Sequence, residues 1–280
     1  MTNCAPLEDE LGDVLEKAMR RAGLNEEALA QRAHVATSSI LDAINYRSEL
    51  SPLELCRLAA ALGLNEIGLC ALGCGLYPLP ALSALPFSVF PLAMKHGIGV
   101  TNAYIVAEAG SSRGILFDTG PDIDVLQSCW PRAIRSLDAV FLTHAEGEHI
   151  GGLCEIAEKF EIDAAYRPQG AVVDCSQPVG EGDVLVFGGL SVTAFSTPGH
   201  SSAHNCYVVE ATSARAGIAL LISGDLFFAG SVGCAHYCQR QLATNLRRML
   251  KAVPAQTVVA PGHGPMTTAE NELRYNPFVV

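Results

Sequence analysis

The chain has 280 residues, of which 49% are hydrophobic and 17% charged, and its formal net charge is −11 at pH 7. This length and composition indicate a globular protein with one large domain or two of ordinary size. The acidic balance argues against a dedicated binder of nucleic acids or anionic membranes, because phosphate groups would be repelled.

The sequence also indicates the cellular compartment of the protein. The apolar stretch Leu76–Leu92 is interrupted by prolines and is no clean membrane span. The N-terminus lacks the basic and apolar regions of a signal peptide. Ten cysteines in a chain with this much core material are expected to be mostly reduced thiols. We therefore expect a cytoplasmic protein that does not enter a membrane.

The first part of the chain is predicted to be helical throughout. Apolar residues at positions 7, 11, 14, 15 and 18 follow one helical stripe. Ser51 and Glu54 form a capping box around Pro52 at the first helical position, and Gly63 ends that helix. Five helices are expected, over Leu7–Arg21, Glu26–Ala33, Thr37–Asn45, Pro52–Leu62 and Asn65–Leu72.

The chain changes character around Gly75–Pro86, which contains prolines at 78, 80 and 86. Prolines remove backbone donors and stiffen the chain, as is typical of a linker. We therefore predict a helical domain at 1–75, a linker at 76–86 and a second domain at 87–280.

The helical part resembles the helix-turn-helix domain of the phage-repressor-like (XRE/Cro) family over roughly residues 7–72. The resemblance is carried by Leu29-Ala30, the small turn Val35-Ala36 and the run Leu58–Gly63. It implies a recognition helix that would enter the major groove of DNA. The DNA contacts it implies are Thr37, Ser38, Ser39 and Arg47.

The charge of this part disagrees with the usual role of that family. Residues 1–75 hold six basic side chains against eleven acidic ones, and phosphate neutralisation supplies most non-specific DNA affinity. The alternative is a helix-turn-helix fold used for dimerisation or for docking a partner. Repressor-like domains often pair, so a homo-oligomer is expected.

From about Phe87 the sequence alternates between short strands and glycine-marked turns. Strands are expected over Thr101–Ala107, Gly114–Phe117 and Leu137–Leu142. The second of these runs into a turn at Asp118–Pro121, and the third runs directly into Thr143–His149 (THAEGEH). Polar clusters just past the ends of buried strands are where open sheets place their sites.

Four more polar elements follow in order. A histidine after a Pro-Gly turn is commonly only a turn residue, but a series of metal-capable residues on glycine-flanked turns indicates one shared metal site. The elements are Ser196–His200 (STPGH), Ala203–Asn205 (AHN), Ser223–Asp225 (SGD) and Pro261–Gly264 (PGHG), the last two after expected strands at Ile218–Ile222 and Thr257–Ala260.

This succession resembles the metallo-β-lactamase superfamily from about residue 87 to residue 268. The resemblance implies an α/β fold, an αββα sandwich with two metal ions at one edge of its sheets. It implies that the first metal takes His144, Glu146 and His200. The second metal would take Glu148, His149 and His263, with Asp225 bridging the two. His204 is expected to support a ligand or to contact substrate.

Two positions depart from the family's usual His-x-His-x-Asp-His pattern, because Glu146 replaces the second histidine and Glu148 the aspartate. Two histidines with one carboxylate is the facial arrangement of non-haem Fe(II) sites, so iron is favoured and manganese is plausible. Zinc stays open, because two histidines and a glutamate also form a known catalytic zinc set.

Three functions follow as alternatives. The leading one is a metal-dependent hydrolase similar to the glyoxalase-II-like branch, in which a metal-bridging hydroxide attacks an ester, thioester or lactone and Glu148 or Asp225 orients or deprotonates the water. The second resembles the flavodiiron branch: a di-iron protein that binds or reduces oxygen or nitric oxide and, lacking a flavin domain, needs a separate electron-donor protein. The third is a transcription regulator with a metal-site sensor domain.

Overall fold

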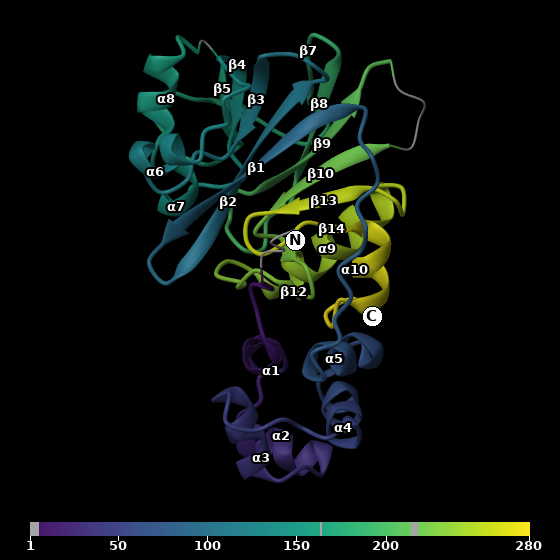
Figure 1. Cartoon of the computed structure of the whole chain (residues 1–280). Coiled ribbons are helices and arrows are strands. Elements are labelled where there is room, and N and C mark those ends of the chain that lie inside the picture. Colours follow the sequence, from purple (N-terminus) through teal and green to yellow (C-terminus); the bar gives the residue numbers. More distant parts are fainter. Residues whose placement is uncertain (1–5, 163, 214–217) are drawn as a thin grey trace.

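The computed structural model describes residues 6–162, 164–213 and 218–280. It shows two packed β-sheets with helices on their outer faces and a bundle of short helices at one end of the molecule (Figure 1). Among the described residues no helix combines the length and apolarity that a membrane crossing requires.

The first sheet has six strands in sequence order. β1 and β2 form a long antiparallel hairpin, β3 pairs antiparallel with β2, and the remaining neighbours are parallel. The strands are β1 (Phe87–His96), β2 (Gly99–Glu108), β3 (Arg113–Phe117), β4 (Ser136–Phe141), β5 (Ala165–Pro168) and β6 (Gln177–Val179).

The second sheet has the order β14-β13-β10-β9-β8-β7, and β10 pairs parallel with β13. Beside it lies a small hairpin of β11 (Phe227–Phe228) and β12 (Ser231–Val232). The strands of the second sheet are β7 (Val184–Phe187), β8 (Leu190–Ser196), β9 (Asn205–Ala211), β10 (Ala219–Gly224), β13 (Val258–Pro261) and β14 (Thr267–Thr268).

The two sheets face each other across an apolar core to which both contribute. The rings of Phe117, Phe141 and Tyr207 contact one another at its centre, with centroids 5.2 to 5.8 Å apart. The helices α6 (Ile123–Ser128), α7 (Gly147–Ile150) and α8 (Leu153–Lys159) lie on the side of the first sheet, and α9 (Gln239–Ala252) and α10 (Ala269–Tyr275) on that of the second. This order of layers confirms the expected αββα sandwich.

The helical end of the molecule contains five short helices, as the sequence predicts. Ser51 and Glu54 form the expected capping box, and Gly63 ends its helix in the left-handed conformation with φ 63°. Glycine is favoured there because a side chain would be strained at positive φ. The helices are α1 (Leu11–Ala22), α2 (Glu26–Ala33), α3 (Thr37–Ile44), α4 (Pro52–Leu62) and α5 (Glu66–Gly73). That α1–α5 form a helix-turn-helix domain stays a prediction.

One helix starts later than expected. The apolar stripe predicts a start at Leu7, whereas α1 begins at Leu11. Glu10 and Asp13 exchange side-chain and backbone hydrogen bonds in a capping box that fixes the helix start there. Leu7 still packs against the core, but from an extended arm, Leu7–Glu10, which leads away from the helix.

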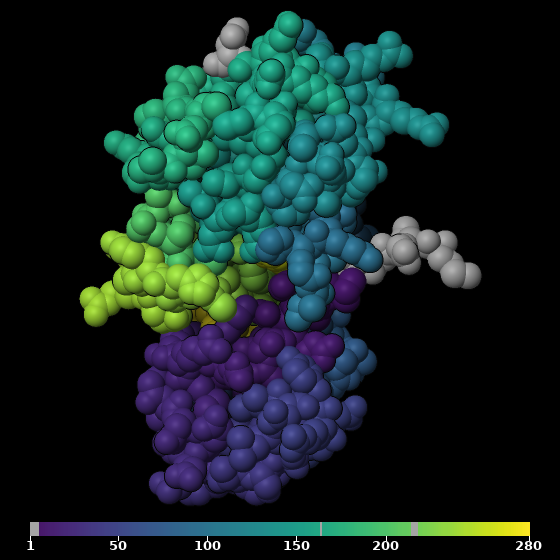
Figure 2. All heavy atoms as spheres, turned by 90° about the vertical axis from the view of Figure 1, so that its left-hand side faces the viewer, coloured from purple at the N-terminus to yellow at the C-terminus, as the bar shows by residue number. Residues whose placement is uncertain are grey.

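The helical end packs directly on the sandwich (Figure 2). The backbone of Asn65 donates to Pro277 O at 2.8 Å, and a Cβ added to Gly68 would lie 2.2 Å from Tyr275 O. The expected linker is also held, because Tyr77 Oη donates to the buried carboxylate of Glu272 at 2.7 Å. The helical part and the second sheet therefore share one continuous apolar core.

Candidate metal centre

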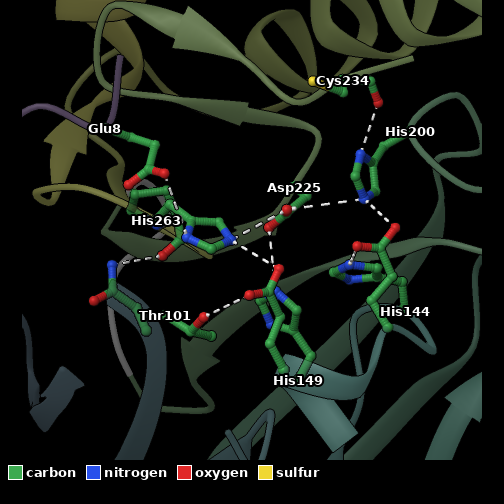
Figure 3. A network of polar contacts seen from close by, with 12 residues as sticks. Glu8, Thr101, His144, His149, His200, Asp225, Cys234 and His263 are labelled. Carbon is green, nitrogen blue, oxygen red and sulfur yellow. Dashed lines mark hydrogen bonds and ion pairs between the residues drawn. The ribbon is translucent and has the colours of Figure 1, made fainter. Parts of the chain in front are cut away.

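Seven side chains with nitrogen or oxygen ligand atoms converge at one edge of the sandwich (Figure 3). They come from loops at the carboxyl ends of strands, where side chains from parallel neighbours meet. We call this set the metal floor: His144 after β4, Glu146, Glu148 and His149 on and before α7, His200 after β8, Asp225 after β10 and His263 after β13.

Three trios in the metal floor have ligand atoms that all lie within 4.8 Å of one another, and two of these trios share no residue. The first is His144, Glu146 and His200, with His200 Nε2 at 2.9 Å from Glu146 Oε1. The second is Glu148, His149 and His263, with His263 Nε2 at 3.7 Å from Glu148 Oε1. A third trio, His144, His149 and Asp225, connects these two. The structure therefore brings the seven predicted residues together, and their assignment to two separate metals stays a prediction.

Asp225 lies between the two trios. Its Oδ2 is 3.8 Å from His200 Nε2 of the first trio and 3.4 Å from His263 Nε2 of the second. Its Oδ1 is 3.6 Å from His149 Nε2. A carboxylate in this place would contribute to holding metal ions at both trios.

Asp118 orients the buried histidines from behind. Its Oδ2 contacts His149 Nδ1 at 3.1 Å and accepts from Thr143 Oγ1 at 2.8 Å, while its Oδ1 accepts from Thr143 N at 2.7 Å. Thr143 Oγ1 in turn lies 2.9 Å from His144 Nδ1. Contacts at Nδ1 direct each Nε2 toward the centre. The sequence places Asp118 only in a turn, and its positive φ of 60° is visible only in the structure.

Backbone carbonyls orient the other two histidines. His200 Nδ1 lies 2.7 Å from Cys234 O, and His263 Nδ1 lies 2.9 Å from Val100 O. All four histidines therefore present Nε2 to the metal floor. No sequence pattern could identify these partners, because any residue type supplies a backbone carbonyl.

The charges of the metal floor influence one another strongly. Burial lowers the pKa of His144 well below its usual range. Burial acts in the same direction on His263, but Asp225 and Glu8 outweigh it and raise the pKa of His263 to about 9. Burial alone would raise the pKa of Asp225, yet His149 and His263 hold it well below its usual value. Ionised carboxylates among buried imidazoles form a cluster that attracts positive charge.

Unsatisfied atoms show that these residues suit metal ions. His144 Nε2, His149 Nε2 and Asp225 Oδ1 are buried and have no hydrogen-bond partner. An unpaired buried polar atom is costly, so its place in a native fold calls for a bound group. Imidazole nitrogens and carboxylate oxygens are ligands of iron, zinc and manganese. The donor set therefore fits a pair of divalent ions.

The remaining predicted site residues lie elsewhere. His204 is 1% exposed, and its Nε2 accepts a hydrogen bond from the backbone of Asp225 at 3.2 Å, so it supports the bridging residue from behind. The predicted DNA contacts are remote from the metal floor, on α3 and the loop after it: Thr37, Ser38, Ser39 and Arg47.

A cavity of about 560 Å³ opens above the metal floor. One side is the tip of the β1–β2 hairpin, from His96 to Val100. The other side comes from the arm before α1 and from α1 itself, which sequence reasoning missed. We call these residues the α1 wall: Glu8, Asp9, Asp13, Glu16, Lys17 and Arg20.

Comparison with known proteins agrees with this geometry. The sequence model described as "Metallo-beta-lactamase superfamily" matches residues 96–263. A hydroxyacylglutathione hydrolase of Xylella fastidiosa (strain M12) is 32% identical over 159 residues, which are 55% of this chain and 57% of that protein. The chain thus spans little more than half the length of that relative.

Two further likenesses cover more of the related protein. A probable metallo-hydrolase of Bacillus subtilis (strain 168), YqgX, is 32% identical over 164 residues, 50% of this chain and 75% of that protein. The solved structure of TTHA1623 in a di-iron-bound form is 27% identical with a TM-score of 0.52, covering 68% of this chain and 99% of that one.

Proposed function

The chain belongs to the metallo-β-lactamase superfamily, and from that membership we propose that it is a metal-dependent hydrolase of an ester, thioester or lactone. The observation that carries the proposal is the pair of ligand trios with Asp225 between them, on the floor of a cavity large enough for a small substrate. The metallo-hydrolases and hydroxyacylglutathione hydrolases among its relatives support the same reaction class.

The roles of the residues follow from their positions. Two divalent ions bound at the trios would supply a hydroxide nucleophile at neutral pH and a Lewis acid for the carbonyl oxygen. Asp225 reaches both trios and is suited to hold an attacking water between them. Glu148 lines the cavity, and Thr101 Oγ1 donates to its Oε2 at 3.3 Å, so it is positioned to accept the proton of that water.

For the metals we propose a pair of iron ions, with zinc or manganese as alternatives. Each trio offers two histidines and one carboxylate, the combination of many non-haem Fe(II) sites. The likeness to a protein solved in a di-iron-bound form supports iron. Metal analysis of protein purified from cells grown with each metal would test this assignment.

Hydrolysis is tested by assaying the protein loaded separately with iron, zinc or manganese against an ester, a thioester and a lactone. We expect turnover of at least one of these with two metals bound per chain. Two bound metals with no turnover of any of the three would refute the hydrolase proposal.

The carboxylate Glu146 favours a second candidate function, a di-iron protein that binds or reduces oxygen or nitric oxide. In the first trio Glu146 supplies a carboxylate oxygen instead of a third histidine nitrogen. A carboxylate is a harder ligand than an imidazole and stabilises iron over zinc. This function would require an electron-donor protein. An optical band of the iron-loaded protein that changes with oxygen or nitric oxide, together with no hydrolysis, would favour it.

We further propose that residues 1–75 form a helix-turn-helix domain, with DNA or protein docking as its alternative roles. Ser38 is exposed on α3, but Arg47 lies 3.9 Å from Asp42, which offsets its charge. A regulator would shift a palindromic duplex at low salt, and the shift would weaken steeply as salt rises. Light scattering would show whether the chain forms a homo-oligomer, which binding of two copies to a palindromic duplex requires.

A further inference from the structure

The α1 wall is fixed to the sandwich and is part of the cavity. Asp9, 8% exposed, accepts hydrogen bonds from Lys17 Nζ and from Ser231 Oγ of the β11–β12 hairpin. Lys17 Nζ also donates to Val232 O at 2.7 Å and lies 5.5 Å from the centre of the Phe228 ring. These contacts hold α1 across the mouth of the cavity.

The arm before α1 reaches the metal floor itself. Glu8 Oε1 lies 3.8 Å from His263 Nδ1, and the Glu8 side chain is 32% exposed (Figure 3). The backbone of the arm approaches so closely that a Cβ added to Gly264 would lie 3.1 Å from Glu8 N. Because Nδ1 is the nitrogen of His263 that points away from the ligand trios, Glu8 lies at the side of the metal floor, where it lines the cavity.

The charges on the α1 wall are unbalanced. It carries four carboxylates and two cationic side chains. Lys17 is paired with Asp9, and Arg20 is paired with Glu16 at 3.0 Å, which leaves the charges of Glu8 and Asp13 without a cationic partner on the wall. On the floor, three carboxylates and one hydroxide would balance two divalent ions. The net negative charge in the cavity therefore comes from the α1 wall.

The space for a ligand extends beyond the metal floor. Lys17 and Arg20 also line an adjoining cavity of about 310 Å³ that runs past Gln239. A substrate longer than the metal floor would therefore pass along the α1 wall.

We propose that the α1 wall sets the substrate charge: the protein hydrolyses neutral or cationic thioesters and esters in preference to anionic ones. This inference rests on the proposed hydrolase function. It also sets the protein apart from a hydrolase of hydroxyacylglutathione, since glutathione is an anionic peptide at neutral pH.

The experiment uses three small acetyl thioesters whose thiols carry different charges. The thiols are 2-(trimethylammonio)ethanethiol, 2-hydroxyethanethiol and 3-mercaptopropionate, which are cationic, neutral and anionic. We expect kcat/KM to be about tenfold higher for the cationic than for the anionic member at low salt. The difference should shrink at about 0.5 M salt, because salt screens exposed charges.

Charge variants assign the preference to the wall. In the double variant Glu8→Gln with Glu16→Gln we expect the cationic-to-anionic ratio of kcat/KM to fall about threefold to tenfold. The matched control, Glu27→Gln with Glu66→Gln, removes the same charge from exposed or half-exposed helix starts outside the cavity and should leave the ratio unchanged. An anionic preference, or equal ratios in both double variants, would overturn the proposal.

A binding measurement separates failure of this inference from failure of the proposed function. The S-ethyl thioethers of the same three thiols cannot be hydrolysed, and their Kd values for the metal-loaded protein can be measured by calorimetry. Tighter binding of the cationic thioether without turnover of any thioester would refute the hydrolase and keep the charge selection. Binding that favours the anionic thioether, or that is equal for all three, would refute the charge selection.

Discussion

The metal floor and the α1 wall line one cavity but differ in how deeply their side chains are buried and how firmly they are held. Floor residues are mostly buried at strand ends, and each histidine is held from behind by a carboxylate, a hydroxyl or a backbone carbonyl. Half of the wall residues, Glu8, Glu16 and Arg20, are exposed, and all six lie on a single helix and its arm. Rigidly held side chains are suited to catalysis, whereas exposed charged side chains are suited to select the substrates that enter the cavity.

This difference predicts that changes in the two regions have separable effects. Floor substitutions should alter metal binding and rate for every substrate. Wall substitutions should alter stability, docking and the preference among substrates. The experiments below test that separation in order of decreasing effect.

The largest effect is expected from Asp225→Asn. Because Asp225 lies between both trios, the amide removes a bridging charge and a water-positioning oxygen together. We expect kcat to fall about 10²- to 10⁴-fold for each of the three thioesters. Bound metal should fall below two ions per chain. Asp174→Asn, an exposed aspartate, is the matched control, and equal loss in both variants would contradict the assignment.

The next effect concerns attachment of the wall. In Lys17→Met the buried Asp9 loses its cation, and breaking such a pair costs about 3–5 kcal/mol. We expect urea unfolding to show this loss and metal content to stay at two ions. Adding Asp9→Asn should restore part of the free energy of unfolding, because the uncompensated charge is gone. A double variant as unstable as Lys17→Met would show that the pair does not act as a unit.

A smaller effect is expected behind the floor. Asp118→Asn keeps a residue type that tolerates positive φ but removes the charge that orients His149. We expect metal affinity to fall about 10- to 100-fold, as measured by competition with a chelator. Asp138→Asn, which removes a carboxylate that pairs with Arg113 outside the metal floor, should leave affinity unchanged. The unfolding midpoint of the metal-free protein will show whether Asp118→Asn perturbs the fold.

The smallest effect is expected outside both regions, where the linker contacts the sandwich at Glu272. Burial raises the pKa of Glu272, which accepts from Tyr77, Thr267 and Asn276. A raised folded-state pKa means that the folded protein binds the proton more tightly than the unfolded chain. Stability is therefore gained as pH falls through the folded pKa and lost as pH rises through it.

The variant Glu272→Gln isolates this contribution, because glutamine does not titrate. We expect the stability advantage of the wild type over the variant to grow as pH falls from 7 to 5, by at most about 1.4 kcal/mol per pH unit. Urea unfolding of the metal-free proteins measures it, with the exposed Glu270→Gln as control. An advantage that is constant over this range would mean that Glu272 has the same pKa in both states.

Sequence predicted the floor better than the wall, for a physical reason. Floor residues such as His144 and Asp225 directly follow apolar strands, and strand ends converge wherever sheets pack, so local pattern carries spatial information. Glu8 and Asp9 reach the cavity only because α1 starts at Leu11 and docks on the β11–β12 hairpin. That placement depends on contacts 222 positions apart along the chain, which no local periodicity encodes.

The layer order, the helices of the first part and the strands of the second were also predictable, because each element has its own apolar period and capping residues. The contacts at the Nδ1 atoms of the four histidines were not predictable from the sequence. Asp118 acts through a backbone turn, and Cys234 and Val100 contribute only carbonyl oxygens. Their side chains carry no sign of that role.

The docking of α1 has a thermodynamic consequence for the far end of the molecule. One face of this helix lines the cavity, and the same helix packs against α3 and α4 in the helical core. A ligand of that distant end that shifted α1 would change the affinity of the cavity for its substrate. By reciprocity, the substrate would change the affinity of the distant ligand by the same factor. Binding at the two ends of the protein would then be thermodynamically linked through α1.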